Sequence, residues 1–486
     1  MARFSMKSIY LVLIFIIITG FALRFAYLDR SIRFDEAQTV YVYATKSIPS
    51  IFADYSAPNN HIFHTIFVHF SFKYLGESPI FVRLPSFIAG LLLIPMSFAV
   101  GKRFYNPTTG LLSASLVAIH PIMIDFSVNA RGYTFIALIT LCLFYIGHDL
   151  QREDNTQKWL LVSLLSALGF LTVPVMLYPM GIFALWLLVS IIHYNDGQQR
   201  NDLLKNYVVS MLLGAILTII FYTPAIYLSG LDSIINNVNI QAMGLNEFYS
   251  QIPTVLGRMW LHISWKMPLI VVVPLILTFI VGIICHRKLS STTLLLVPFM
   301  LVWIVPLLLL QRVDPFPRVW HFLVPLLLII SSAGIAYILE RLRINQPLFL
   351  GSGLVLLSLG MSAYIAQSEI IPNSTFTLRV PDSERVAFFL NDIMTPNDVI
   401  IMRVPSSYTV LYYSLIHDLS LGDTANNENS DSPEIIDDSP AYIYIVYHHN
   451  GELADLYNSF AEEIDNSEII QEWDYGVVRR GIQQTD

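Results

Sequence analysis

Two adjacent carboxylates, Asp35 and Glu36, lie in the segment Arg33-Phe34-Asp35-Glu36-Ala37, a few residues after the first long apolar run. A carboxylate beside a membrane surface is suited to take the proton of an acceptor hydroxyl, which is general base catalysis. The same pattern is also that of a solvated loop with a helix start at Asp35. The dipeptide by itself leaves both interpretations open.

A second polar group follows in residues 57–64, which contain Asn60, His61 and His64. In a helix, His61 and His64 share a face at spacing i, i+3. Together with Asp35 they are candidate ligands for a divalent metal such as Mg²⁺, Mn²⁺ or Zn²⁺. Two histidines beside aromatic residues at an interface are equally consistent with ordinary hydrogen bonding, so the metal is an open alternative.

Two arginines are candidates for binding a phosphate. Arg131 lies in Ser127-Val128-Asn129-Ala130-Arg131-Gly132-Tyr133, and Arg318 precedes an apolar run. The guanidinium fork suits a phosphate group, and charges close to a membrane are costly enough to be functional by default. The alternative for each arginine is a long stem that extends along the interface without a ligand.

Membrane helices must position these residues. The chain of 486 residues is 55% hydrophobic and 13% charged, whereas a soluble domain has about 25% charged residues. Several apolar runs reach the roughly 20 residues that cross a bilayer. We predict a polytopic α-helical membrane protein whose spans, about eleven, lie near 9–28, 82–101, 109–124, 132–149, 159–172, 174–193, 207–228, 267–285, 292–310, 320–339 and 347–366.

Charge sets the expected orientation. The short loops on one side of this arrangement carry Lys and Arg, which the positive-inside rule assigns to the cytoplasm. From residue 369 onward the chain has 21 Asp and Glu against five Arg and no Lys. This acidic tail argues against nucleic-acid binding. We predict two domains: a membrane domain, 1–366, with a catalytic outer loop, 29–81, and an extracytoplasmic domain, 367–486.

The tail is expected to be a small α/β domain. Hydrophobic periodicity predicts helices at 382–393, 406–416 and 452–461, strands at 398–404 and 441–447, a strand or hairpin at 469–480, and a polar, turn-rich segment at 422–440.

The chain resembles glycosyltransferase family 39, the GT-C membrane glycosyltransferases that include protein O-mannosyltransferases and lipid A aminoarabinose transferases. The matching elements occur in the same order at 33–36, 60–62, 83–86, 120–121 and 130–133. The resemblance covers residues 10 to 150 well, with weaker support from Arg318 and the closing domain. Two positions depart from the pattern: Ile62 replaces a common proline, and Asn129 replaces a Glu, for which Asp125 is a candidate substitute.

The resemblance implies transfer of a sugar from a polyprenyl-phosphate donor to an extracytoplasmic acceptor, with inversion at the anomeric carbon. It implies that Asp35 is the base or positions the acceptor, and that Glu36 supports it. The residues that it assigns to the donor phosphate are Arg131, Arg318 and His61. As supporting residues we expect Arg33, Asn60, His64, Tyr133 and Asp125.

A lipid-linked donor is consistent with the rest of the chain. The sequence contains no Asp-x-Asp motif, no Walker A loop and no GxGxxG, the motifs that accompany nucleotide substrates. Nucleotide sugars are not available outside the cytoplasm, where the carboxylates are expected. The predicted setting is the bacterial inner membrane, with the protein crossing it many times among membrane lipids.

Other functions are compatible with the helices alone. A secondary transporter or a flippase of lipid-linked sugars has a similar number of spans, but such proteins usually show repeat symmetry and polar groups near the membrane midplane. Here the ionisable residues gather at one interface. Another lipid-dependent transferase, such as a phosphoethanolamine transferase or an oligosaccharide ligase, is the further alternative.

Overall fold

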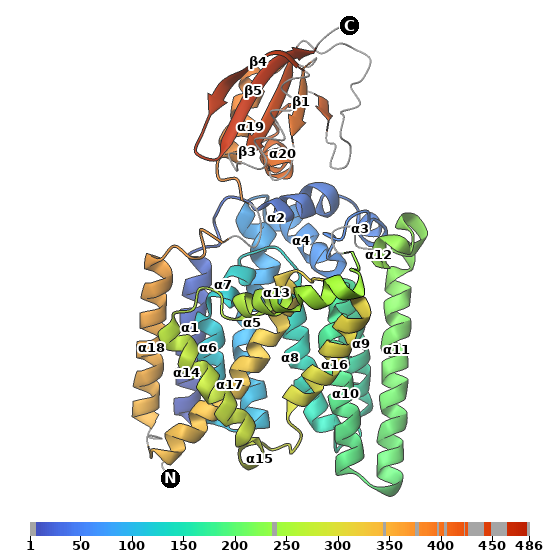
Figure 1. Cartoon of the computed structure of the whole chain (residues 1–486), viewed down its shortest axis with the longest axis vertical. Coiled ribbons are helices and arrows are strands. Elements are labelled where there is room, and N and C mark those ends of the chain that lie inside the picture. Colours follow the sequence, from blue (N-terminus) through green and yellow to red (C-terminus); the bar gives the residue numbers. More distant parts are fainter. Residues whose placement is uncertain are drawn as a thin grey trace. The chain divides into compact units, whose positions relative to one another are not determined.

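The computed structural model (Figure 1) describes residues 6–235, 241–343, 347–374, 379–395, 398–402, 406–421, 423–425, 442–448 and 464–483. The chain forms two compact units. The first unit comprises Met1–Leu28, Ile48–Phe67 and Arg83–Asn373. The second unit comprises Asp29–Ser47, Val68–Val82 and Ser374–Asp486.

The first unit is helical. Its helices, two of which also contribute residues to the second unit, are α1 (Met6–Phe25), α3 (Ile48–Ala53), α4 (Ile62–Leu75), α5 (Pro79–Phe104), α6 (Pro107–Ile119), α7 (Pro121–Ser127), α8 (Tyr133–Leu150), α9 (Thr156–Thr172), α10 (Leu177–Tyr194), α11 (Gly197–Ser229), α12 (Asp232–Ile235), α13 (Leu245–Ile263), α14 (Leu269–Ile284), α15 (His286–Leu289), α16 (Leu296–Gln311), α17 (Leu323–Arg341) and α18 (Pro347–Gln367). Short 3₁₀ segments, η2 (Pro174–Met176) and η3 (Pro317–Phe322), precede α10 and α17.

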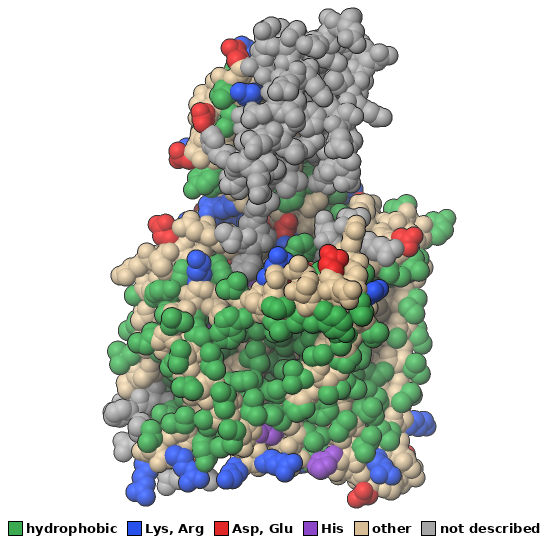
Figure 2. Space-filling model, in the orientation of Figure 1, with side chains coloured by type: hydrophobic (Ala, Val, Ile, Leu, Met, Phe, Trp, Pro, Cys, Tyr) green, Lys and Arg blue, Asp and Glu red, His purple; other side chains and the backbone are tan. Residues whose placement is uncertain are grey.

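Within the described residues, six helices are long and apolar enough to cross a bilayer, and α6 with α7 make a seventh span if the bent pair is one crossing. Three further apolar helices are shorter. Each of the eleven predicted spans coincides with one of these helices or with α9, so the polytopic helical fold is confirmed. Figure 2 shows hydrophobic side chains over the helical body, with Lys and Arg side chains along its lower edge. The chain is an integral, multi-pass membrane protein.

The span predicted at 109–124 is bent by 63° between α6 and α7. The bend follows from Pro121, which lacks an N–H and so cannot donate to Val117 O. The next donor, Ile122 N–H, turns to the His120 side chain, where it donates to Nδ1 at 3.3 Å. The helix therefore loses the usual donors for Val117 O and Ala118 O.

Arg24 of α1 replaces those donors. Its guanidinium donates to Val117 O at 3.2 Å and to Ala118 O at 2.9 Å. The Nε–H donates to Ser127 Oγ at 3.0 Å. Arg24 is fully buried, and a buried charge is tolerated where all its donors find acceptors. This arginine thus fixes the bend and the end of α7, from which the segment carrying Arg131 begins.

The second unit contains a five-stranded sheet of order β2-β1-β3-β5-β4. Its strands are β1 (Val399–Met402), β2 (Asp423–Ala425), β3 (Ile443–His448), β4 (Ile464–Glu472) and β5 (Gly476–Gln483). Strand β1 runs parallel to β2 and β3, whereas β5 is antiparallel to both β3 and β4. The helices α19 (Ser383–Ile393) and α20 (Ser406–Ile416) belong to the same unit, as do α2 (Phe34–Gln38) and the π-helix η1 (Thr39–Ala44).

The helices predicted at 382–393 and 406–416 correspond to α19 and α20, and the strands predicted at 398–404 and 441–447 correspond to β1 and β3. The prediction is wrong at β2, which is a strand paired with β1 inside the segment that we expected to be turn-rich. The hairpin β4–β5 occupies the segment predicted as a strand or hairpin at 469–480. The helix predicted at 452–461 lies outside the described residues. So does the turn-rich segment 422–440, apart from β2.

Candidate active site

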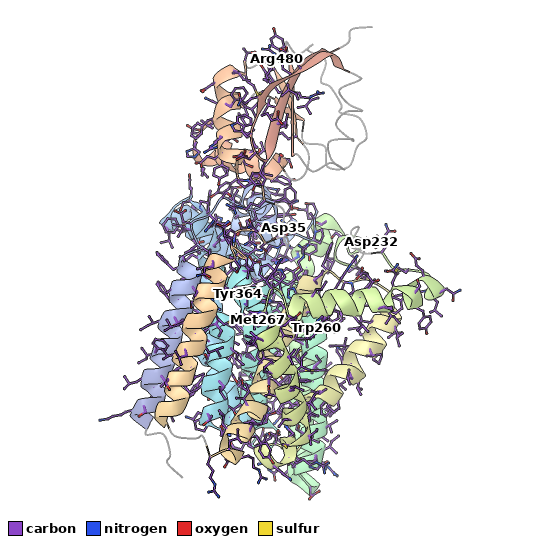
Figure 3. The ribbon with its side chains drawn as sticks, turned by 60° about the vertical axis from the view of Figure 1, so that its left-hand side comes forward. Asp35, Asp232, Trp260, Met267, Tyr364 and Arg480 are labelled. Carbon is purple, nitrogen blue, oxygen red and sulfur yellow. The ribbon has the colours of Figure 1, made fainter. Side chains whose placement is uncertain are left out.

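The two adjacent carboxylates have different environments in the second unit. Arg33 N–H donates to Glu36 Oε2 at 2.9 Å, so the Glu36 carboxylate caps the first turn of α2. Glu36 is fully buried, whereas Asp35, labelled in Figure 3, is only partly buried. Helix α2 continues into η1, a π-helix, which is a rare element found mostly at functional sites. Asp35 is therefore the more exposed of the two carboxylates.

Arg33 is a supporting residue of this turn. It is buried and forms an isolated antiparallel bridge with Arg379 of the closing domain. Its backbone thus links the start of α2 to the segment that precedes α19.

In the first unit, the segment after α3 is held in place by packing and by Asn60. Ile51, Tyr55 and Ile62 belong to one apolar cluster with residues of α9 and α11. Asn60 Nδ2 donates to Ile51 O at 2.9 Å and to Asp54 O at 2.7 Å. Asn60 therefore has a structural function, because its two hydrogen bonds stabilise the turn between α3 and α4.

His61 and His64 both face the turn that precedes α8. Gly132 N–H donates to His61 Nδ1 at 2.8 Å. The His64 Nε2 atom lies 2.8 Å from Ser86 Oγ, and the Ser86 hydroxyl donates to Arg131 O at 3.1 Å. Because His61 Nδ1 accepts a hydrogen bond, the neutral ring carries its proton on Nε2. The two histidines thus hold the peptide group between Arg131 and Gly132, His61 directly and His64 through Ser86.

His61 is a neutral donor rather than a cation. Burial lowers its pKa well below the ordinary value, and the nearby positive charge of Arg131 and the neighbouring His64 and Arg318 lower it further. Any contribution of His61 to a bound phosphate is therefore hydrogen-bond donation from Nε2, not charge.

Arg131 and Arg318 both lie near the ring of Tyr133. The guanidinium carbon of Arg131 lies 6.0 Å from the Tyr133 ring centroid, and that of Arg318 lies 5.9 Å from the same centroid. Arg131 is buried and donates to Asn59 O at 3.3 Å, and Arg318 also lies over Phe316. Both positive charges also act on His61, and two cations near one buried group favour a multivalent anion there.

Asp125 and Asn129 are both fully buried beside this turn. Within the described residues, neither polar atom of the Asn129 side chain has a hydrogen-bond partner. Buried polar groups are nearly always paired, so this amide has unmet hydrogen-bonding capacity next to Arg131. That property fits a binding site.

Three buried histidines were not predicted as site residues. His321 stacks on Phe126 with ring centroids 4.5 Å apart, and His262 lies 5.7 Å from His321. Burial lowers the pKa of His262 to about 3, with a further contribution from His120. The sequence signals were the matching element at 120–121, which contains His120, and the position of His321, three residues after Arg318. His120 and His262 come from distant elements that only the fold brings together.

An apolar cavity of about 330 Å³ adjoins this cluster. Figure 3 labels two of its lining residues, Trp260 at the end of α13 and Met267 before α14. Much of α14 is exposed on its other faces, as expected for a helix in contact with lipid. The cavity is lined by His120, Trp260, Ile263, Ser264, Met267, Val272, Leu275, Ile276, Phe279, Val324, Leu327, Leu328 and Ser331.

The structure thus brings together His61, His64, Arg131, Tyr133 and Arg318. Asp35, Glu36 and Arg33 belong to the second unit, so their convergence with the arginines stays a prediction. Among the described residues, no group of three or more His, Cys, Asp or Glu side chains is arranged to hold a metal ion. The metal at Asp35, His61 and His64 likewise stays a prediction.

Residues 58–227 match the family model of dolichyl-phosphate-mannose-protein mannosyltransferases. This range includes His61, Ser86, Arg131 and Tyr133 of the site. No curated protein matches the chain by sequence.

Solved structures show similarity over almost the whole chain. ArnT from Cupriavidus metallidurans, in the apo state and bound to undecaprenyl phosphate, matches 96% of this chain and 97% of its own, at 12% identity and TM-scores of 0.62 and 0.61. The archaeal oligosaccharyltransferase AglB from Archaeoglobus fulgidus, in complex with an inhibitory peptide and a dolichol-phosphate, matches 88% of this chain and 61% of its own, at 10% identity and a TM-score of 0.51. At these identities the likeness shows a common fold.

Proposed function

We propose that this chain, a membrane glycosyltransferase of the dolichyl-phosphate-mannose-protein mannosyltransferase family with the GT-C fold, transfers a sugar from a polyprenyl-phosphate carrier to an extracytoplasmic acceptor. The observation that carries the proposal is that Arg131 and Arg318 both lie within about 6 Å of the Tyr133 ring centroid and both act electrostatically on His61, in the unit that also holds an apolar cavity.

The arginine pair and the cavity match the two ends of a lipid phosphate. Arg318 lies in η3, and the next helix, α17, supplies Val324 and Leu328 to the cavity wall. A carrier whose phosphate is bound by the arginines can therefore extend its apolar chain along α17 into the cavity. The cavity volume of about 330 Å³ is at the lower end of the range for ligand sites, roughly 300–1,000 Å³, and suits a short stretch of an isoprenoid chain.

The names of the two structural relatives agree with such a carrier. The ArnT structure contains undecaprenyl phosphate, and the AglB structure contains a dolichol-phosphate. Both are polyprenyl phosphates. This support is by analogy of fold, whereas the arginine pair and the cavity belong to this chain.

In the proposed reaction, Asp35 accepts the proton of the acceptor's nucleophilic group. The acceptor atom forms a bond to the anomeric carbon while the bond from that carbon to the phosphate oxygen breaks. The polyprenyl phosphate leaves with the electron pair, and Arg131 and Arg318 stabilise the charge that develops on it. A single displacement of this kind inverts the anomeric carbon.

We also propose that the closing domain is extracytoplasmic and that the membrane is the bacterial inner membrane. The distribution of charge supports this orientation, because the short basic loops and the acidic tail differ as the positive-inside rule expects. The separation into a membrane domain, 1–366, and a soluble domain, 367–486, remains part of this proposal.

The test is donor turnover by the purified protein. A panel of polyprenyl-phosphate sugars is incubated with the wild-type protein and with Asp35→Asn, with and without a chelator, and release of free polyprenyl phosphate is measured. We expect release from at least one donor by the wild type and release roughly 10²–10⁴-fold slower by Asp35→Asn. Equal release by both proteins would remove Asp35 from its role, and turnover of none of the donors would count against a polyprenyl-phosphate carrier.

A further inference from the structure

Helix α20 is an unusual element for a small soluble domain, because it is buried on nearly all sides. Residues 406–414 of this eleven-residue helix are all buried. A helix that is buried all round must pack against two partners. Within the second unit, one partner is α19, where Ser383 Oγ donates to Thr409 Oγ1 at 2.7 Å. The other is the segment that carries Asp35.

The contact with that segment is made by tyrosines. Ile32 N–H donates to the Tyr413 hydroxyl at 3.1 Å, and this hydrogen bond is buried. Five residues earlier, the Tyr408 ring packs against Phe34 at 5.4 Å and Tyr41 at 6.2 Å between centroids. The Tyr413 and Tyr408 side chains therefore contact the chain on both sides of Arg33, where α2 begins.

A second anchor lies on the same stretch of chain. Arg379 Nε–H donates to Ser31 Oγ at 2.7 Å, and the Arg379 backbone pairs with Arg33. The residues that precede Asp35 are thus fixed from the closing domain by one buried hydroxyl, one guanidinium and one backbone bridge.

We propose that Tyr413 is a positioning residue for Asp35, and that the closing domain holds the catalytic carboxylate in place through α20. Ile32 lies three residues before Asp35, and its N–H fixes where α2 starts. Moving the start of a five-residue helix redirects every side chain on it. A misplacement of about 1 Å can lower a rate roughly 100-fold. The Tyr413 hydroxyl therefore affects the reaction rate by setting the position of the Asp35 carboxylate. The inference rests on the proposed role of Asp35.

Tyr412 is a matched control in the same helix. It is also buried, and its hydroxyl donates a hydrogen bond to Glu77 O at 2.5 Å, whereas the Tyr413 hydroxyl accepts one from Ile32 N–H. Glu77 belongs to the chain between α4 and α5, not to the segment that precedes Asp35. Removing either hydroxyl deletes a hydrogen bond made by α20, the Tyr413 bond buried and the Tyr412 bond partly buried, but only the Tyr413 hydroxyl contacts the segment that leads into α2.

The experiment measures kcat, donor KM and thermal stability for the full-length variants Tyr413→Phe and Tyr412→Phe. We expect Tyr413→Phe to lower kcat about 10-fold with donor KM unchanged, because the arginines that hold the phosphate are untouched. Tyr412→Phe should leave kcat within about twofold. Both should lose similar thermal stability, since each loses one hydrogen bond.

A double variant separates positioning from general damage. In an Asp35→Asn background, Tyr413→Phe should cause no further loss, because the group that it aims is gone. An unchanged kcat for Tyr413→Phe, an equal fall for Tyr412→Phe, or a further loss in the double variant would each overturn the inference. If Asp35→Asn is itself as active as the wild type, the proposed function fails instead, so the two failures are distinguishable.

Ser31→Ala is a second variant in case Tyr413→Phe folds poorly. It removes the Arg379 hydrogen bond and leaves α20 intact. A fall in kcat of about threefold with unchanged donor KM is expected, and a change in donor KM instead of kcat would contradict the assignment.

Discussion

The proposed site has two parts that are stabilised in different ways. We call the residues around Arg131 and Arg318 the phosphate half and the segment that carries Asp35 the carboxylate half. In the first unit, Arg131 and its neighbours are held by many contacts among membrane helices, including His61 to Gly132 and Ser86 to Arg131 O. In the second unit, Asp35 lies on a short helix whose start depends on a few hydrogen bonds. The difference indicates that the phosphate half is preformed, whereas the carboxylate half depends on the soluble domain.

The same comparison applies within the carboxylate pair. Asp35 and Glu36 are adjacent in sequence, but their environments differ. The Glu36 carboxylate accepts the Arg33 N–H at the start of α2, whereas Asp35 is partly exposed. This difference supports the proposal that Asp35 is the base and that Glu36 has a structural role.

The largest expected effect distinguishes these two residues. Asp35→Asn should lower kcat by roughly 10²–10⁴, the range for loss of a general base, with little change in thermal stability. Glu36→Gln should lower kcat no more than about fivefold, because the amide oxygen still accepts the Arg33 N–H. Turnover assays on both purified variants decide the matter, and a greater loss for Glu36→Gln would reverse the two roles.

The next effect concerns the framework of the phosphate half. Arg24→Met should leave Val117 O and Ala118 O without their donor, at about 1–3 kcal/mol for each buried carbonyl. We expect a lower unfolding temperature in detergent and a lower yield of folded protein. Lys7→Met, an exposed position on the same helix, is the control and should behave as the wild type. Equal stability of the two variants would show that the bend does not need Arg24.

The sequence predicts much of the phosphate half and little of its framework. Arg131 and Arg318 are found because charged residues at the ends of apolar runs are rare enough to indicate function. The bend at Pro121 and the role of Arg24 are missed, because the pattern of apolar residues continues through the break and pairing of Arg24 with α6 is a tertiary contact. The histidine pair His262 and His321 is missed for the same reason.

In the carboxylate half, the sequence predicts the local elements but not the contacts between them. The helices and strands of the closing domain follow from periodicity, and the segment with Asp35 follows from its motif. Their connection does not, because the Tyr413 hydroxyl and the Ile32 N–H are 381 residues apart. No local pattern reports such a pairing.

Arg318 gives the third effect. Arg318→Ala should raise the donor KM about 10- to 100-fold, since a hydrogen bond to a charged group contributes roughly 1.5–3 kcal/mol. Acceptor KM should be unchanged. Arg318→Lys should recover part of the loss, because it keeps the charge but not the guanidinium fork. Steady-state kinetics with varied donor test this, and an unchanged donor KM for Arg318→Ala would remove it from the phosphate site.

The smallest effect is on pH dependence and comes from His61 in the preformed half. Its pKa is lowered in the folded protein, chiefly by burial, whereas in the unfolded chain it is near 6.5. Below that pH the unfolded chain binds the extra proton, so stability falls as the pH drops from about 6.5 toward the folded pKa. Above about pH 6.5 this group contributes no pH dependence, because it is neutral in both states.

The slope is at most about 1.4 kcal/mol per pH unit for one group. His262 adds a dependence of the same sign, because burial lowers its pKa too. The informative quantity is therefore the difference between the wild type and His61→Gln, whose side-chain oxygen can still accept the Gly132 N–H. Thermal unfolding at pH 5.5 and 7.5 should show a smaller acid shift for His61→Gln. An equal shift in both proteins would mean that His61 is already accessible to protons in the folded state, and the phosphate half would then be less closed than its contacts indicate.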